Sequence, residues 1–155
     1  MHSITIRPAV SGDIPACQEI LVHSPLGDAY FSDPEKARGT LETGLAREQL
    51  HVAVTAAGTC AGFLWWEPNG AFHCFPYLHM IVVRDTLRGQ GIGSQMLRYF
   101  EDCVSESAKK VFLVVADFNP DAKRLYERVG YVQVGSIPDL YMPGELEALM
   151  MKQLG

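Results

Sequence analysis

The sequence has little of what marks membrane, secreted or nucleic-acid-binding proteins. No apolar run approaches the roughly 18 residues of a membrane span. The start of the chain, Met1–Ile4, lacks the basic and apolar regions of a signal peptide. The formal net charge is −5, without a block of lysine or arginine, whereas polynucleotide binding requires a basic surface. We therefore expect a soluble cytoplasmic protein that binds neither membranes nor nucleic acids.

Cysteine is also scarce, and its spacing excludes the common disulfide and metal frameworks. No C-x-x-C pair occurs among the four cysteines, which are Cys17, Cys60, Cys74 and Cys103. His73 and Cys74, with His79 nearby, could belong to a metal site, but they lack a spaced partner pair. We expect no metal, and cysteines that are structural or incidental.

Length and hydrophobic pattern are those of one globular domain. The chain has 155 residues, of which 48% are hydrophobic and 20% charged, enough for an independent core. Predicted strands are 3–9, 51–55, 60–66, 77–84, 110–116, 131–134 and 145–152. Helical patterns begin near Ser11, Asp33, Ile92 and Asn119, and Glu67–Gly70 is a predicted turn.

The order of these elements predicts the fold class. Strands alternate with helices along much of the chain, which favours an α/β (α+β) domain over residues 1–155. We expect a mixed central sheet of about seven strands, flanked by about four helices. Lys110–Ala116 is almost entirely apolar after its lysine, which is typical of a central strand buried on both faces.

The most informative segment joins a predicted strand to a predicted helix, and it reads Arg88-Gly89-Gln90-Gly91-Ile92-Gly93-Ser94. The first amides of a helix have no partner within the helix, and glycines let an oxyanion approach them closely. The segment therefore suits a phosphate or pyrophosphate; the alternative is a plain glycine turn. The dinucleotide pattern G-x-G-x-x-G fails at Ser94, and the absence of a Gly-Lys pair excludes the nucleotide P-loop.

Two motifs in this chain resemble those of the GCN5-related N-acetyltransferases (GNATs). The pattern R/Q-x-x-G-x-G/A occurs at Arg88, Gly91 and Gly93. The pattern N-x-x-A-x-x-L/F-Y-x-x-x-G-F/Y follows at Asn119–Tyr131. With their flanking strands the motifs cover Tyr77–Val134, while the N-terminal third is similar only in architecture. The resemblance implies a GNAT-like domain whose splayed central strands form an acyl-CoA cleft.

The same resemblance implies how acetyl-CoA is held as a co-substrate. Backbone amides of the loop would bind the pyrophosphate, and strand residues Met80–Val83 would hydrogen-bond the pantetheine arm. A bulge would splay this strand from the strand Val111–Ala116. Asn119 would either contact the pantetheine or cap the following helix. The residues assigned to acetyl-CoA are Ile81, Val82, Val83, Arg88, Gly89, Gln90, Gly91, Ile92, Gly93, Ser94 and Asn119.

Direct transfer from a thioester to an amine needs a neutral amine, a polarised carbonyl and a proton for the departing thiolate. Tyr126 matches the family tyrosine that hydrogen-bonds the CoA sulfur and can protonate it; the alternative is a core aromatic residue. The base stays open between His79, Glu67 and water. His79 shares one strand face with Tyr77 and Ile81, and Tyr77 stands where some family members have glutamate.

The resemblance implies transfer of an acetyl group from acetyl-CoA to a primary amine by direct attack in a ternary complex, and we expect no metal to be required. A small-molecule amine is the leading acceptor, and the resemblance implies that the first two helices and Gly135–Gly144 wall its site. A protein N-terminus or lysine is the alternative acceptor. A non-catalytic acyl-CoA sensor is the alternative function, but Tyr126 favours an enzyme. The sequence does not decide whether the chain forms a homodimer.

Overall fold

The computed structural model of this chain describes residues 3–155 and contains one seven-stranded sheet. The order of the strands in the sheet is β1-β2-β3-β4-β5-β7-β6. β4 and β5 are parallel, whereas β1–β2, β2–β3, β5–β7 and β6–β7 are antiparallel, so the predicted mixed sheet is confirmed. The strands are β1 Ile4–Pro8, β2 Leu50–Thr55, β3 Cys60–Ala71, β4 Phe75–Val83, β5 Lys110–Ala116, β6 Val132–Pro138 and β7 Leu146–Gln153.

The described residues form five α-helices, one more than the sequence predicts. They are α1 Ile14–Val22, α2 Pro25–Tyr30, α3 Pro34–Ala46, α4 Ile92–Val104 and α5 Pro120–Arg128, with short 3-10 turns at Ser11–Asp13 (η1) and Asp85–Leu87 (η2). The additional helix is α2, whose six residues are too few to show a hydrophobic period. Across residues 3–155, no helix combines the length and the apolar composition needed to cross a membrane.

The chain divides into two compact units that each contribute to the sheet. The first unit comprises the residues up to Trp66 together with Met80–Tyr99. The second comprises Glu67–His79 and Phe100–Gly155. β3, β4 and α4 therefore each begin in one unit and end in the other.

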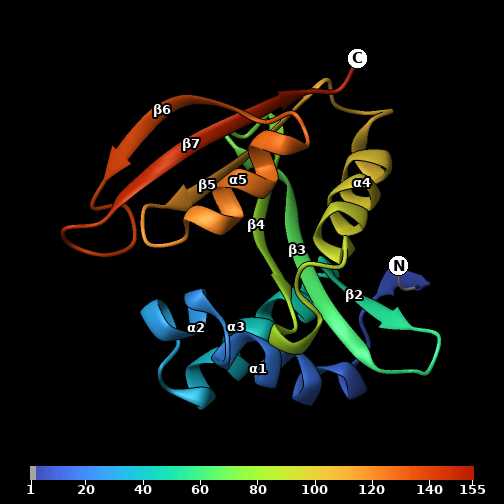
Figure 1. The fold of residues 1–155 in the computed structure, drawn as a ribbon. Helices are drawn as coiled ribbons and strands as arrows, with labels where there is room; N and C mark the ends of the chain where they lie inside the picture. The colour runs from blue at the N-terminus through green and yellow to red at the C-terminus, as the bar shows by residue number, and fades with distance from the viewer. Residues whose placement is uncertain (1–2) are drawn as a thin grey trace. The chain divides into compact units, whose positions relative to one another are not determined.

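In the first unit, the N-terminal helices contribute one side of the core. α1 buries Ile14, Cys17 and Leu21, and α3 buries Ala37 and Leu41, as their spacing predicts. These side chains pack in one cluster with residues of β2 and β3. Asp33 accepts a hydrogen bond from the Glu35 amide at 3.0 Å and so caps α3. Figure 1 shows α1, α2 and α3 lying together in this unit.

Gly27 in α2 is expected to be essential for stability, because no larger residue fits there. A Cβ atom at this position would lie 2.1 Å from the Leu21 carbonyl oxygen and 2.6 Å from that of Val22. We predict that Gly27→Ala lowers the free energy of unfolding by about 1–3 kcal/mol. Gly39→Ala is the matched control, since a Cβ atom at Gly39 meets no atom within 4 Å. It should raise stability by about 0.5–1 kcal/mol.

Denaturant unfolding of both variants measures the two effects. Equal stabilities for Gly27→Ala and the unchanged protein would contradict the close contact of α2 with the end of α1.

In the second unit, β5 is the central element. It pairs with β7 along its whole length, from Lys110↔Gln153 to Ala116↔Glu147, and it is buried at most positions as predicted. β7 also pairs with β6, and Figure 1 shows β5, β7 and β6 running side by side. α5 packs against β5. β4 pairs with β5 at Tyr77↔Phe112 and Leu78↔Leu113, both in the first half of β4. The splay beyond these pairs stays a prediction.

The predicted turn at Glu67–Gly70 is wrong. β3 continues through these residues to Ala71, and the chain reverses over residues 72–74, where the Cys74 amide donates to the Ala71 carbonyl at 3.1 Å. Phe72 and His73 both have left-handed φ angles, 57° and 58°, as the two central residues of a type I′ turn do. Residues other than glycine rarely adopt left-handed φ angles, so the sequence does not mark the true turn. Pro68, Asn69 and Gly70 are typical turn residues, and they led to the wrong prediction.

Candidate functional site

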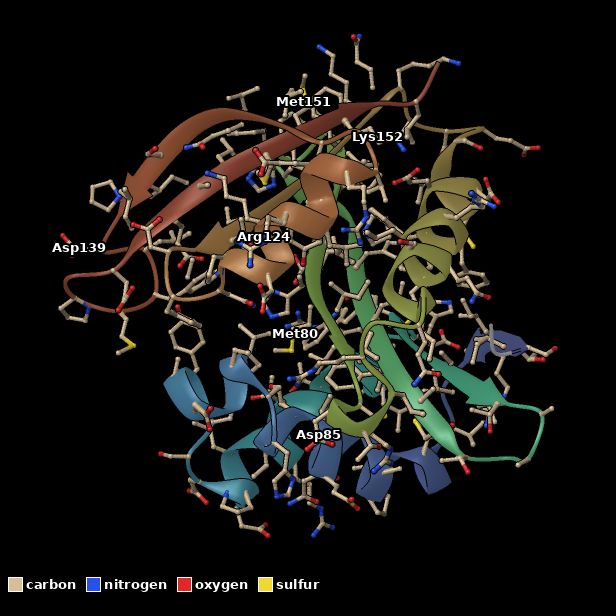
Figure 2. All side chains as sticks on the ribbon, viewed as in Figure 1. Met80, Asp85, Arg124, Asp139, Met151 and Lys152 are labelled. Carbon is tan, nitrogen blue, oxygen red and sulfur yellow. The ribbon has the colours of Figure 1, made fainter. Side chains whose placement is uncertain are left out.

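The glycine-rich loop lies in the first unit, where β4 ends at Val83 and α4 begins at Ile92. Asp85, labelled in Figure 2, starts the turn η2 between them. Gly89 and Gly91 have φ angles of +77° and +81°, which glycine adopts without the strain that a Cβ atom would cause. Both glycines are therefore required by the backbone conformation of the loop.

The loop has the features that an oxyanion requires. The Gln95 amide donates to the Gly91 carbonyl at 3.1 Å, so Gly91 is the N-terminal cap of α4. The amides of Ile92, Gly93 and Ser94 consequently have no partner within the helix, and they lie at the positive end of its dipole. A Cβ atom at Gly89 or Gly91 would meet no atom within 4 Å, so the backbone there is open. This arrangement fits a pyrophosphate group.

Arg84 and Arg88 connect the end of β4 and the start of the loop to other parts of the first unit through hydrogen bonds and an ion pair. Arg84 donates through Nε to the Cys60 carbonyl at 2.8 Å, and its amide donates to the Ala61 carbonyl at 2.7 Å. Its guanidinium also pairs with Glu19 of α1 at 3.0 Å. Arg88 lies with Nε 3.4 Å from the Val83 carbonyl oxygen. The contacts of Arg84 carry no sequence signal, because they join segments far apart along the chain.

The strand that leads into the loop alternates as predicted. Met80 and Val82 are buried, with 7% and 6% of their surface exposed, whereas Ile81 and Val83 are half-buried. Tyr77 and His79 lie on the half-buried face, as expected, and their ring centroids are 6.1 Å apart.

Tyr77 belongs to a polar cluster of the second unit that the sequence does not reveal. Its hydroxyl lies 2.9 Å from that of Tyr141, which comes from the segment after β6. Burial, with the neighbouring Tyr141 and the charges of Glu147 and Glu67, raises the pKa of Tyr77. Tyr77 therefore stays neutral at physiological pH and does not replace a carboxylate base.

Two further sequence expectations about this region need correction. Glu67 lies within β3 rather than after it, and a Cβ atom at Gly70 would be 2.6 Å from its Oε2. β6 extends to Pro138 rather than ending at Val134 as predicted, so the first part of Gly135–Gly144 is strand. The role of this segment as a wall of the acceptor site stays a prediction. Glu147 is almost completely buried, with 3% of its surface exposed, and sequence analysis missed it because β7 looks like an ordinary alternating strand.

Tyr126 is the buried residue of α5, with 7% of its surface exposed. Burial raises the pKa of its hydroxyl, which therefore remains protonated and able to donate at any physiological pH. Its ring meets that of Tyr131 edge to face, with centroids 6.0 Å apart. The helical spacing of Ala122, Leu125 and Tyr126, with Val129 just after the helix, predicts one buried face, but Ala122, Leu125 and Val129 are only half-buried.

A polar network fixes the position of Tyr131, the aromatic neighbour of Tyr126. Tyr131 donates to Glu101 at 3.1 Å, and the same carboxylate accepts from Lys152 at 2.7 Å. Lys152 lies in β7 and is labelled in Figure 2. The Tyr131 amide donates to the Tyr126 carbonyl at 2.9 Å. Tyr126 is thus held by both the backbone and the ring of a residue that is itself anchored.

Asn119 occupies the N-terminal cap position of α5, but its side chain makes no capping hydrogen bond. Its carbonyl accepts from the Lys123 amide at 3.3 Å. Of the two roles open for Asn119, side-chain capping is therefore not what the structure shows, and contact with a ligand stays a prediction. No group of three or more His, Cys, Asp or Glu side chains suited to a metal occurs in the described part of the chain.

Known proteins share both the sequence pattern and the fold. The model of the acetyltransferase (GNAT) family matches residues 16–131. Acetyltransferase Atu2258 of Agrobacterium fabrum is 35% identical over 66 residues, which cover 41% of this chain and 46% of that protein. The match thus spans less than half the length of this curated relative.

Solved structures extend the likeness to almost the whole chain. A GNAT-family acetyltransferase from Bacillus cereus superposes with a TM-score of 0.78, 17% identity and 97% coverage of both chains. The yncA protein of Salmonella typhimurium, solved with its cofactor acetyl-CoA, has a TM-score of 0.74 and 17% identity, with 99% of this chain and 95% of that one covered. At such identities the likeness shows the fold. Together with the family match over most of its length, it establishes that this chain belongs to the acetyltransferase (GNAT) family.

Proposed function

We propose that this acetyltransferase transfers the acetyl group of acetyl-CoA directly to a primary amine, most favourably that of a small molecule, in the cytoplasm. The observation that carries the proposal is the loop Arg88–Ser94, whose two left-handed glycines expose helix-terminal amides for a pyrophosphate. Acetyl-CoA carries such a pyrophosphate, and the solved yncA structure contains acetyl-CoA. Tyr126, which matches the family tyrosine that hydrogen-bonds the CoA sulfur, favours an enzyme over a sensor, because a protein that only binds the co-substrate needs no proton donor.

The proposed reaction assigns a task to each group. The amides of Ile92, Gly93 and Ser94 hold the pyrophosphate, and the strand residues Ile81–Val83 align the pantetheine arm. The backbone amide near Ile81 polarises the thioester carbonyl as the amine attacks. Tyr126 donates a hydrogen bond to the sulfur as negative charge develops on it. Because the pKa of Tyr126 is raised, we expect hydrogen bonding to matter more than complete proton transfer.

A comparison of acceptors tests the proposed substrate class. Purified protein and acetyl-CoA are incubated with a panel of small amines and with peptides bearing a free N-terminus or a lysine, and acetylated products are detected by mass spectrometry. Acetylation of small amines supports the proposal. Acetylation of peptides only would assign the protein to the alternative acceptor class, and acetylation of none, despite binding of acetyl-CoA, would favour the sensor.

His79 is the proposed general base, with Glu67 and water as its alternatives. An imidazole can take a proton near neutral pH with little tuning. We predict that His79→Ala lowers kcat by roughly 10²-fold, the scale of general-base catalysis, and removes the acidic limb of the pH–rate profile. Glu67→Gln is the matched comparison and should leave that limb in place. Wild-type kcat for His79→Ala at pH 7, with a loss in Glu67→Gln, would transfer the role to the carboxylate.

A further inference from the structure

A row of aromatic side chains lies along one face of the sheet in the second unit. Phe75 and Tyr77 point to the same side of β4, and Phe112 is the register partner of Tyr77 on β5. The centroid of the Phe112 ring is 5.4 Å from that of Phe75 and 5.5 Å from that of Phe72. The Tyr77 hydroxyl lies 2.9 Å from the Tyr141 hydroxyl. We call these five residues, Phe72, Phe75, Phe112, Tyr77 and Tyr141, the aromatic row.

Both ends of the aromatic row are open to solvent. Phe72 is 66% exposed and Tyr141 is 49% exposed. Met151, labelled in Figure 2, is the β7 partner of Phe112 and is half-buried on the same face. Exposed aromatic and apolar side chains that gather in one place mark a surface that binds a ligand or a partner. The row therefore offers an apolar surface to the ring of a ligand.

Glu67 places a carboxylate beside the row. β3 and β4 are neighbouring strands, and a Cβ atom at Gly70 would lie 2.8 Å from the Cβ of Glu67 and 2.9 Å from the Cβ of Tyr77. The same Cβ atom would be 2.6 Å from the Glu67 carboxylate oxygen Oε2. The side chains of Glu67 and Tyr77 therefore leave the backbone side by side, with the carboxylate folded over Gly70.

Glu147 adds a second carboxylate, from β7. It pairs with Ala116 of β5, so its side chain points to the sheet face of the row, and only 3% of its surface is exposed. Burial is the main cause that raises the pKa of the hydroxyls of Tyr77 and Tyr141, and the negative charges of the two glutamates add to it. Both carboxylates therefore lie near the tyrosine pair, which is the polar end of the row.

The two ends of the row suit different parts of one small molecule. A primary aliphatic amine is protonated at neutral pH, and it is attracted by carboxylates and by tyrosine rings. Phenylalanine rings pack edge to face or offset against the ring of a ligand. Neighbouring strands are about 4.8 Å apart, so a small molecule can reach from Phe112 on β5 to Tyr77 on β4. The ring centroid of the proposed base His79 is 6.1 Å from that of Tyr77, which places the base at the polar end.

We propose that the aromatic row, with Glu67 and Glu147, binds the acceptor, and that this acceptor is a primary amine that carries an aromatic ring and no carboxylate. The inference rests on the proposed transfer to a small amine. The ammonium lies between the two glutamates and the tyrosine pair, and the ring packs against Phe72 and Phe112. A carboxylate on the ligand would be repelled by both glutamates.

Titration calorimetry at pH 7 in the presence of CoA, which carries no acetyl group, measures amine binding alone. The probe is 2-phenylethylamine. Ethylamine lacks its ring, 1,4-diaminobutane has a second ammonium in place of the ring, and phenylalanine adds a carboxylate. We expect 2-phenylethylamine to bind at least roughly tenfold more tightly than each of the three. Equal or tighter binding of any comparison compound, or no binding of 2-phenylethylamine, would overturn the proposal.

Turnover separates this inference from the proposed function. Binding of 2-phenylethylamine without acetylation when acetyl-CoA replaces CoA would contradict acetyl transfer and support the binding site. Acetylation of amines that lack a ring, but not of 2-phenylethylamine, would support the proposed function and overturn the aromatic acceptor.

Variants test the two ends of the row. Glu147→Gln keeps the side-chain volume and should raise the dissociation constant of 2-phenylethylamine roughly tenfold. Phe72→Asn removes an exposed ring at a φ angle of 57°, which asparagine tolerates, so it should weaken 2-phenylethylamine roughly threefold or more and leave ethylamine unchanged. Unchanged affinity for 2-phenylethylamine in Phe72→Asn would overturn the proposal even where Glu147→Gln does not fold. So would wild-type affinity in a folded Glu147→Gln variant.

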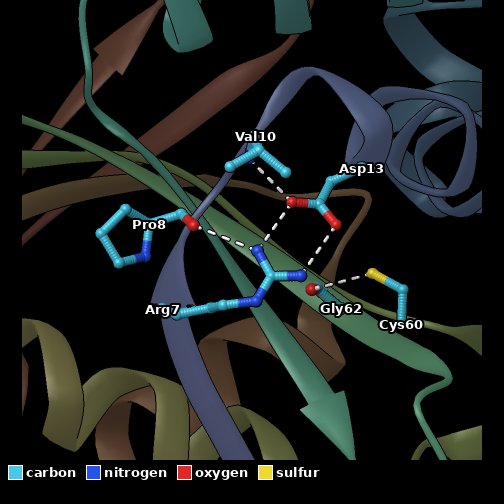
Figure 3. A network of polar contacts seen from close by, with 6 residues as sticks. All are labelled: Arg7, Pro8, Val10, Asp13, Cys60 and Gly62. Carbon is cyan, nitrogen blue, oxygen red and sulfur yellow. Dashed lines mark hydrogen bonds and ion pairs between the residues drawn. The ribbon is translucent and has the colours of Figure 1, made fainter.

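Asp13→Asn is the matched control for the loss of a partly buried carboxylate. Asp13 belongs to the first unit and accepts two hydrogen bonds from Arg7, at 2.8 and 3.0 Å (Figure 3). Its replacement should lower stability and leave the affinity for 2-phenylethylamine at the wild-type value. An equal loss of affinity in Asp13→Asn and Glu147→Gln would show that the effect comes from lost stability, and it would overturn the proposal.

Discussion

Replacing Tyr126 by phenylalanine is expected to lower kcat by roughly 10- to 10³-fold, which corresponds to about 1.4–4 kcal/mol of transition-state stabilisation. Phenylalanine keeps nearly the same volume in the buried position of α5, where Tyr126 is 7% exposed, so the fold should persist. The hydroxyl is lost, and its hydrogen bond should strengthen as charge develops on the CoA sulfur. The effect should therefore appear in kcat more than in KM.

The raised pKa of Tyr126 adds a second expectation for this variant. The hydroxyl remains protonated across the physiological range, so the ratio of wild-type to Tyr126→Phe rates should not change with pH there. Tyr131→Phe is the matched control, since it keeps the neighbouring ring and loses only the bond to Glu101. It should cost about 1 kcal/mol of stability and little kcat. Unchanged kcat in Tyr126→Phe, with the chemical step limiting, would make Tyr126 a packing residue.

Valine at Gly91 is expected to raise the dissociation constant of acetyl-CoA by roughly 10²-fold or more, or about 2.7 kcal/mol. Gly91 has a φ angle of +81°, which a β-branched residue adopts only with strain. The loop must therefore change conformation, and the amides at the start of α4 lose their alignment toward the pyrophosphate. Gly93→Val should also weaken binding, in this case by covering the amides, because Gly93 already lies in the helix.

Gly58→Val is the control for the effect of backbone strain alone. Gly58 has a φ angle of +87° and an open surrounding, but it lies in the turn between β2 and β3. The Gly58→Val variant should lose about as much stability as Gly91→Val while keeping the wild-type affinity for acetyl-CoA. Titration calorimetry measures the three affinities, and circular dichroism shows whether each variant folds. Wild-type affinity in both Gly91→Val and Gly93→Val would remove the loop from the binding site.

Local patterns predicted most of the fold because they act through neighbouring residues. The apolar run of β5 is found where the sequence places it, and α3 and α4 begin at or next to the predicted residues Asp33 and Ile92. The helical spacing of Ile92, Met96, Phe100 and Val104 also matches their burial on one face of α4. The turn at Phe72 and His73 was missed because left-handed conformations of these residues are imposed by the hairpin and have no local signal.

The candidate site was predictable only where a motif carries it. The roles of Arg88–Ser94 and Tyr126 follow from motifs. The structure adds the left-handed glycines of the loop and the burial of Tyr126, and the roles themselves stay predictions. The hydroxyl pair of Tyr77 and Tyr141, by contrast, joins residues that are distant along the chain. No pattern in a single sequence reports such a pairing, because it depends on tertiary packing rather than on spacing.

The most direct test of the proposed function is the amine-dependent release of CoA thiol from acetyl-CoA by the purified protein, measured together with the acetylated amine. Direct transfer predicts that thiol and N-acetyl product form in equal amounts, only when an amine is present and without an added metal. No thiol release with any amine or peptide, from protein shown by calorimetry to bind acetyl-CoA, would contradict acetyl transfer by this chain.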